Sequence, residues 1–180
     1  DIVILEPPTS PDQDFIKRVI GVPGDVLEIK PDYTKGGSQP RAAVLVKPGG
    51  QGDWQVLGES YLPDQTADPW VDVTSCCTAD GHSSPQPNPI TIPQDQYFVL
   101  GDNRNASKDS RAIGLIPRDK ILGRAWIRIW PFSHMGFLGP GPTLTAALAL
   151  PLPIGRMAWR RRPRPRRPWF RRTPRAPAPD

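Results

Sequence analysis

Short apolar runs that favour β-structure, separated by turn residues, dominate the first 138 positions of the chain. Residues 2–5 read IVIL and are followed by three prolines within six positions, which predicts a buried strand and an irregular loop. Residues 14–20 and 25–30 are two further β-rich runs around the tetrapeptide VPGD at 22–25. Pro fixes φ at the second turn position and Gly supplies a positive φ at the third. This pattern predicts a β-hairpin.

The same alternation of strands and turns continues toward residue 130. Residues 42–47 and 54–57 flank the Gly-rich segment PGGQG, which predicts a second hairpin. Residues 90–92 and 97–100 read as strands. Residues 121–130, ILGRAWIRIW, alternate with a period of two, so one strand is expected there. Strands without a convincing amphipathic helix indicate an all-β fold of antiparallel sheets, of Greek-key or barrel-like type.

Composition divides the chain in two near residue 139. Residues 1–139 carry 13 basic and 17 acidic side chains, whereas residues 140–180 carry 10 arginines and one aspartate. The net charge of +5 for the whole chain therefore describes neither part. We expect a β-domain over 1–139, with a surface loop insertion at 63–89, and a Pro/Arg-rich tail over 140–180.

The tail combines prolines with like charges, which disfavours regular structure, so we expect it to be disordered. The favoured interpretation is a solvated extension with no nucleic-acid partner. Its arginines and interleaved Trp159, Trp169 and Phe170 leave one alternative open, which is binding to nucleic acid or to an anionic membrane.

The adjacent cysteines Cys76 and Cys77 are the chain's only two. Vicinal cysteines close a very small ring that is rarely a structural disulfide, so two ordinary thiols in a loop are expected. Neither a metal nor another cofactor is expected, because His82 and His134 lie too far away to complete a metal-ligand spacing.

Two features of the chain bear on membranes and on its beginning. No apolar run approaches the roughly 20 residues of a membrane-spanning helix. The sequence starts at Asp1 without an initiator methionine and without a signal sequence. We interpret the chain as a fragment or as a protein whose N-terminal part is missing.

The strand expected at 14–20 places Lys17 and Arg18 on opposite faces. If Lys17 faces inward, lost hydration lowers its pKa toward the range of a general base. In the opposite register Arg18 faces inward, remains charged and requires a buried carboxylate. Alternation alone leaves both registers open.

A polar loop, GDNRNASKDSR at residues 101–111, follows the strand at 97–100. Taken alone, such a loop is usually a set of Asx-turns and surface ion pairs. It does not fit an EF-hand, because Arg104 stands where an oxygen ligand is required. It also lacks the glycine spacing and the Lys-Ser/Thr ending of a phosphate-binding loop.

Together, FIKRVIGVPGD (residues 15–25) and GDNRNASKDSR resemble the two most diagnostic motifs of type I signal peptidases. The initial DIVI resembles that family's GDIVV-type strand without its glycine, and WPF at residues 130–132 resembles its closing segment. The resemblance covers roughly residues 1–138 in the family's order. It implies the all-β catalytic fold of signal peptidases. It also implies the family's activity, that of a serine endopeptidase that cuts signal peptides from exported precursors with a Ser/Lys dyad.

On this resemblance, Lys17 matches the general base and Ser107 matches the residue whose hydroxyl orients it. Asp109 and Arg111 match an ion pair that braces the loop. The substrate is expected as an extended strand beside residues 14–16, so the substrate-binding residues implied are Asp14, Phe15 and Ile16.

The chain departs from the family at the nucleophile. The family's Ser-Met-x-Pro motif occurs nowhere in the 180 residues, whose only methionines are Met135 and Met157. We therefore expect this chain alone to be inactive.

The implied partners are the signal peptides of exported preproteins. The resemblance also implies attachment to a membrane through a missing N-terminal anchor, with the catalytic domain on the outer face. The alternative function is a non-catalytic relative that binds peptides.

Overall fold

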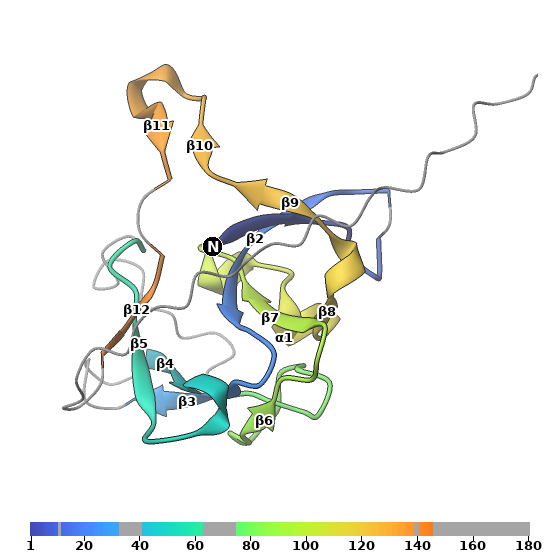
Figure 1. Ribbon diagram of the computed structural model, residues 1–180, viewed down its shortest axis with the longest axis vertical. Coiled ribbons are helices and arrows are strands. Elements are labelled where there is room, and N and C mark those ends of the chain that lie inside the picture. Colours follow the sequence, from blue (N-terminus) through green and yellow to red (C-terminus); the bar gives the residue numbers. More distant parts are fainter. Residues whose placement is uncertain (11, 33–40, 63–74, 139–140, 146–180) are drawn as a thin grey trace, which may run out of the picture. The chain divides into compact units, whose positions relative to one another are not determined.

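Two antiparallel sheets form the framework of the computed structural model, which describes residues 1–10, 12–32, 41–62, 75–138 and 141–145 (Figure 1). Sheet A has the order β8 (Ile116–Pro117), β7 (Gln96–Leu100), β2 (Phe15–Gly21), β1 (Ile2–Leu5) and β9 (Ile121–Ala125). Sheet B has the order β12 (Thr143–Thr145), β5 (Gln55–Gly58), β4 (Arg41–Lys47), β3 (Val26–Asp32) and β6 (Ile90–Thr91). A separate ribbon pairs β10 (Ile127–Arg128) with β11 (Gly136–Phe137). The expected antiparallel all-β fold is confirmed. In the described residues the strands are accompanied by one short α-helix, α1 (Ser110–Ile113), and by four 3-10 turns of three residues each.

Strand β7 lies between two apolar cores and is buried on both faces. Phe98 and Leu100 belong to the larger core, which also contains residues of β3, β4 and β5. Tyr97 and Val99 point the other way and pack with β1, α1 and β8 in the smaller core. Because successive side chains of a strand alternate between faces, β7 joins the cores and holds the loop that follows it on a rigid support.

The turn at residues 22–25 has the expected conformation but does not form a hairpin. Gly24 has a φ of 90°, and the Asp25 amide donates to the carbonyl of Val22 over 3.0 Å. The strands on either side enter different sheets, since β2 pairs with β1 and β7 whereas β3 pairs with β4 and β6. The hairpin prediction is therefore wrong. The buried Asp25 carboxylate instead accepts from the amides of Val22 and Gly49, which fixes a corner between the sheets.

The second predicted hairpin is confirmed, because β4 and β5 pair antiparallel. The strand expected over residues 121–130 is interrupted at Trp126. Strand β9 pairs with β1, whereas β10 leaves sheet A and pairs with β11. The period-two alternation of the sequence continues across this break. The sequence pattern therefore does not reveal that the partner strand changes.

The loop insertion expected at 63–89 is only partly testable, because residues 63–74 lie outside the described residues. Most of residues 75–89 are exposed, but the two cysteines are an exception. Cys76 and Cys77 are fully buried in the larger core, and Cys76 forms β-bridges with Ile29 and Ser83. The two cysteines form a disulfide, so the expectation of two free thiols in a surface loop is wrong. Cysteine readily occupies apolar interiors. The polar residues on both sides of the pair nevertheless favoured the expectation of a surface loop.

The boundary expected at 139–140 falls on residues outside the described part, as does the arginine-rich segment from 146 onward. Residues 143–145 were expected to belong to a disordered tail. They instead form β12 and pair with β5, Thr143 opposite Gly58 and Leu144 opposite Leu57. The two threonines flanking Leu144 favour an edge strand, and the tail expectation is wrong for these three residues.

Candidate active site

Strand β2 is covered on both faces in its second half, which is why alternation could not decide between Lys17 and Arg18. Lys17 follows Phe15 on the face that packs with the smaller core, whereas Ile20 on the other face belongs to the larger core. Lys17 lies opposite Val3 of β1, and Arg18 lies opposite both Ile2 and Leu100. Both registers weighed from the sequence are thus partly right, because one strand carries an inward-facing cation on each side.

Arg18 is buried and has the carboxylate partner that such a position requires. Its Nε and Nη2 donate to the two carboxylate oxygens of Asp102 over 2.8 and 2.7 Å. Its guanidinium also lies 3.7 Å from the centre of the Tyr61 ring. Desolvation opposes the charge, but the hydrogen bonds and charge of Asp102 outweigh it and raise the pKa of Arg18. Arg18 is consequently a fixed cation and not a proton acceptor.

Lys17 has the opposite electrostatic character. Burial lowers the pKa of its ammonium below the ordinary 10.5, the charge of Asp109 opposes this, and the charge of Arg111 lowers the pKa further. Its Nζ lies 5.0 Å from the centre of the Phe15 ring. The side chain is half-buried, so the amine is desolvated yet accessible, as proton transfer requires.

Gly101 brings Lys17 and Ser107 together. A Cβ added at Gly101 would collide with Oγ and Cβ of Ser107 and would lie 3.7 Å from Lys17 Nζ. The absence of a side chain at this position is therefore what allows Ser107 to lie so near the lysine. Ser107 Oγ is buried and has no hydrogen-bond partner within the described part of the chain, so its hydroxyl is available to the amine.

Asp109 and Arg111 form a buried ion pair that braces this loop. Arg111 donates through Nε and Nη2 to the two oxygens of Asp109, each over 2.8 Å. Asp109 is completely buried, begins α1 as its N-cap, and accepts from the Gly101 amide over 3.0 Å. The pair therefore fixes the backbone at Gly101, directly beside Lys17 and Ser107.

Residues 14–16 lie at an open stretch of sheet A. Strand β7 pairs with β2 only from Arg18 onward, and the Val19 amide donates to the carbonyl of Asp1 on the β1 side. Because antiparallel pairing alternates, the backbone groups of Ile16 point toward the opposite edge. No strand in the described ranges pairs with them there. Asp14 is exposed, Phe15 is half-buried, and Ile16 is 65% exposed.

Sequence reasoning missed a second buried ionic group beside the loop. Arg104 is 5% exposed, and it pairs with Glu59 through Nη2 and, over 3.0 Å, through Nη1. Tyr61 donates to the same carboxylate over 2.7 Å. Burial and the Glu59 carboxylate together raise the pKa of the Tyr61 phenol, so it stays a neutral donor. The sequence signal was weak, because Glu59 and Arg104 are 45 positions apart.

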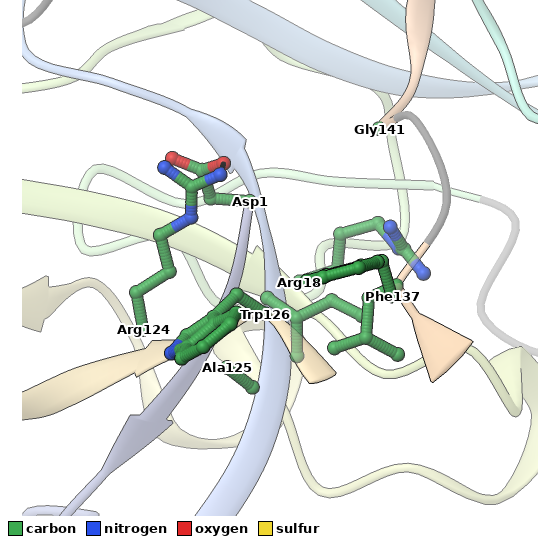
Figure 2. A pocket seen from close by; sticks show the side chains of 9 residues that line it. Asp1, Arg18, Arg124, Ala125, Trp126, Phe137 and Gly141 are labelled. Atoms are coloured by element: carbon green, nitrogen blue, oxygen red, sulfur yellow. Dashed lines mark ion pairs between the residues drawn. The ribbon is translucent and has the colours of Figure 1, made fainter. Parts of the chain in front are cut away.

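A cavity of about 310 Å³ lies beside β1, β9 and the β10–β11 ribbon (Figure 2). Arg124 pairs with Asp1 at its margin over 3.3 Å, and the rings of Trp126 and Phe137 stack with centres 6.0 Å apart. Arg18 also lines this cavity, whereas Lys17 and Ser107 do not. The cavity is consequently distinct from the site formed by Lys17 and Ser107.

Many large apolar side chains are exposed on the β10–β11 ribbon, on the turn that joins its strands and at Trp126 just before β10. Figure 1 shows the ribbon extending away from the sheets. The exposed set comprises Trp126 at 60%, Ile127 at 42%, Ile129 at 67%, Trp130 at 68%, Phe132 at 73%, Met135 at 61% and Phe137 at 78%. These exposed side chains make the ribbon a candidate contact surface.

The described residues lack two kinds of feature. They contain no helix long and apolar enough to span a membrane. They also contain no group of three or more His, Cys, Asp or Glu side chains arranged to hold a metal ion.

Comparison with known proteins places the chain in a family. A family model described as signal peptidase, peptidase S26, matches residues 1–130. Signal peptidase IB of Staphylococcus aureus (strain MRSA252) is 40% identical over 128 residues, which are 69% of this chain and 57% of that protein. Signal peptidase I of Leptolyngbya laminosa is 33% identical over 150 residues, which are 79% of this chain and 58% of that protein.

Among solved structures, a signal peptidase I from Enterococcus faecalis V583 is similar with a TM-score of 0.45 and 26% identity, over 68% of this chain and 91% of that one. The chain spans about half the length of the curated relatives it matches. The extent of the family match, covering 130 of 180 residues, shows that the chain belongs to the signal peptidase family, peptidase S26.

Proposed function

We propose that this chain forms part of a serine endopeptidase that removes signal peptides from exported precursor proteins, with Lys17 as its general base. One observation carries the proposal. Ser107 and Lys17 Nζ both lie next to Gly101, so close that a side chain at position 101 would collide with Ser107. The lowered pKa of Lys17 supports it, because a general base must be neutral near the working pH. Membership of the signal peptidase family supports the choice of substrate.

In this mechanism, the neutral Lys17 amine takes the proton of a serine hydroxyl as that oxygen attacks the scissile carbonyl. An acyl ester forms, the C–N bond breaks, and the ammonium returns its proton to the departing amine. Water then hydrolyses the ester with Lys17 again as base. The hydroxyl of Ser107 orients the amine, and the Asp109–Arg111 pair holds the loop that carries Ser107.

The attacking serine is not one of the 180 residues in this proposal. No Ser-Met-x-Pro segment occurs among them, and Ser107 is assigned to orientation. The catalytic unit is therefore completed by a serine outside this sequence, and the 180 residues supply the base and its supports.

The substrate would bind as an extended strand along the open edge of β2. The backbone N–H and C=O of Ile16 point toward that edge, so they are free to pair with a peptide main chain. Phe15 and Ile16 would contact its side chains, and the exposed carboxylate of Asp14 lies at the start of this edge. This arrangement brings the peptide past Lys17, the next residue of β2.

We further propose that the domain works beside a membrane, on its outer face. The exposed aromatic and aliphatic side chains of the β10–β11 ribbon support this, because such side chains gain free energy at a lipid interface. Attachment through an N-terminal anchor belongs to the same proposal.

The test is to express the chain together with whatever residues its gene encodes before Asp1 and to measure cleavage of a peptide with small residues at the cut site. Lys17→Ala should lower turnover by at least about 10³-fold, because the base is lost. The wild-type rate should rise with pH through the pKa of Lys17, below 10.5, since only the neutral amine accepts a proton. Lys120→Ala serves as the control, because Lys120 pairs with Glu6 at a partly exposed site.

Equal turnover in the Lys17→Ala and Lys120→Ala variants would refute the assigned base. Peptide binding without cleavage by the wild-type protein would favour a non-catalytic relative instead.

A further inference from the structure

The geometry points to Glu59 as a positioning residue for the Lys17 site, acting through Arg104 on Gly101. Glu59 comes directly after β5 of sheet B, whereas Lys17 lies on β2 of sheet A. The inference rests on the proposed function for its catalytic meaning. The physical coupling that it describes can be measured without any activity.

The contact between Glu59 and Arg104 is almost completely shielded from water. The side chains are 9% and 3% exposed respectively, and both carboxylate oxygens face the guanidinium. Ion pairs removed from water hold their geometry strongly, because breaking one leaves a charge buried without its counter-charge. Glu59 thus fixes where the Arg104 guanidinium lies.

Arg104 in turn holds the loop at two points. Its Nε donates to the carbonyl of Gly101 over 3.0 Å. Its own carbonyl accepts from Arg111 Nη2 over 2.7 Å. Since Asp109 accepts from the Gly101 amide, both backbone polar groups of Gly101 are held by buried charged side chains. Gly101 can move only if one of these charge-assisted hydrogen bonds breaks.

A second path leads from Glu59 to the same place. Tyr61 donates to Glu59, and its ring stacks against the guanidinium of Arg18. Arg18 is the neighbour of Lys17 on β2 and is held by Asp102, the residue after Gly101. Glu59 therefore supports both the strand that carries Lys17 and the loop that carries Ser107.

Three guanidinium groups around this loop each pair with a carboxylate. The guanidinium groups of Arg18, Arg104 and Arg111 face the carboxylates of Asp102, Glu59 and Asp109 respectively. Removing the Glu59 charge takes away a carboxylate that pairs with the buried Arg104, which holds the Gly101 carbonyl. We expect the Arg104 guanidinium to move toward water, and the Gly101 carbonyl that it binds to move with it.

The experiment compares amide hydrogen exchange in the isotopically labelled 180-residue chain and in its Glu59→Ala and Glu59→Gln variants, by NMR. Glu28→Gln is the matched control, because Glu28 is a half-buried carboxylate of sheet B that pairs with Lys30. Glu59→Ala should make the Gly101 amide exchange at least tenfold faster, with a smaller increase in Glu59→Gln, whose amide oxygen can still accept from Arg104. The side-chain NMR signal of Lys17 should shift in both. Exchange at Val46 in the larger core should change by less than twofold.

Unchanged exchange at Gly101 would overturn the inference, and so would an equal acceleration at Gly101 and Val46, which reports general destabilisation. If Glu59→Ala does not fold, Glu59→Gln against Glu28→Gln decides the question by the same criteria. These readouts need no substrate, so a failure of the proposed peptidase function would leave them intact. In the active longer protein, Glu59→Gln should lower kcat while KM stays within twofold.

Discussion

The loop Gly101–Arg111 and the β10–β11 ribbon break the usual rule of burial in opposite directions. The loop buries charged groups, with Asp109 at 0% and Arg111 at 5% exposure. The ribbon exposes aromatic groups, with Phe132 at 73% and Phe137 at 78% exposure. In a domain stabilised only by its own folding, charged side chains are mostly exposed and aromatic side chains mostly buried, so both regions are exceptions.

The difference between the two regions lies in what their interactions accomplish. In the loop each buried charge has an oppositely charged partner at hydrogen-bond distance, so the cost of desolvation is offset and the geometry becomes specific. In the ribbon the apolar surface contributes little to folding, so its free energy remains available for association. The loop is built to hold a shape, and the ribbon is built to make a contact.

The largest expected effect is that of Asp109→Ala. The substitution leaves the buried Arg111 guanidinium without this carboxylate and removes the acceptor of the Gly101 amide. We expect the free energy of unfolding to fall by about 3–5 kcal/mol, measured by urea denaturation at neutral pH.

The matched control is Glu6→Ala, whose partner Lys120 is about a third exposed. It should lose at most about 1 kcal/mol. Similar losses in both variants would show that the loop is no more dependent on its charges than the surface is.

Gly101→Ala should have the next largest effect. The added methyl group collides with Ser107, and such overpacking costs about 1–3 kcal/mol. Thermal unfolding gives the stability, and the NMR signals of Ser107 and Lys17 should both move.

Gly123→Ala in β9 is the comparison, because nothing lies within 4 Å of a Cβ added there. Its stability should change by less than about 0.5 kcal/mol. If Gly101→Ala is equally silent, Ser107 is not held where the loop geometry indicates.

The smallest effect on folding is expected for the double substitution of Trp130 and Phe132 by serine. These side chains are 68% and 73% exposed, so the free energy of unfolding should change by less than about 1 kcal/mol. Binding to phospholipid vesicles, measured by sedimentation, should weaken at least several-fold, because less apolar surface enters the interface.

A large loss of stability with unchanged vesicle binding would reverse the contrast between ribbon and loop. It would make the ribbon's aromatic residues part of the folded core.

Alternation and turn residues predicted most strands, because both depend on local geometry. Strands β1, β2, β4, β5 and β7 follow directly from these signals. The partner of a strand depends on distant residues, so the corner at Asp25 was mistaken for a hairpin and the break at Trp126 was missed.

The same limit applies to the candidate site. Lys17, Ser107, Asp109 and Arg111 were singled out by motif, and the structure gathers them around Gly101. Their catalytic roles stay predictions. Glu59 could not be found, because nothing local distinguishes a glutamate that pairs with an arginine 45 positions away from one on a solvated surface.

The number of residues in β2 limits how this strand can change during evolution. Lys17 and Arg18 occupy adjacent positions on opposite faces, each opposite a defined residue of β1. Inserting or deleting one residue within the strand would exchange their environments, moving the fixed cation Arg18 to the place of the proposed base Lys17. Loops before and after the strand can vary in length without this penalty. The residue count of β2 is thus as strict a constraint on a working descendant as the identity of any side chain on it.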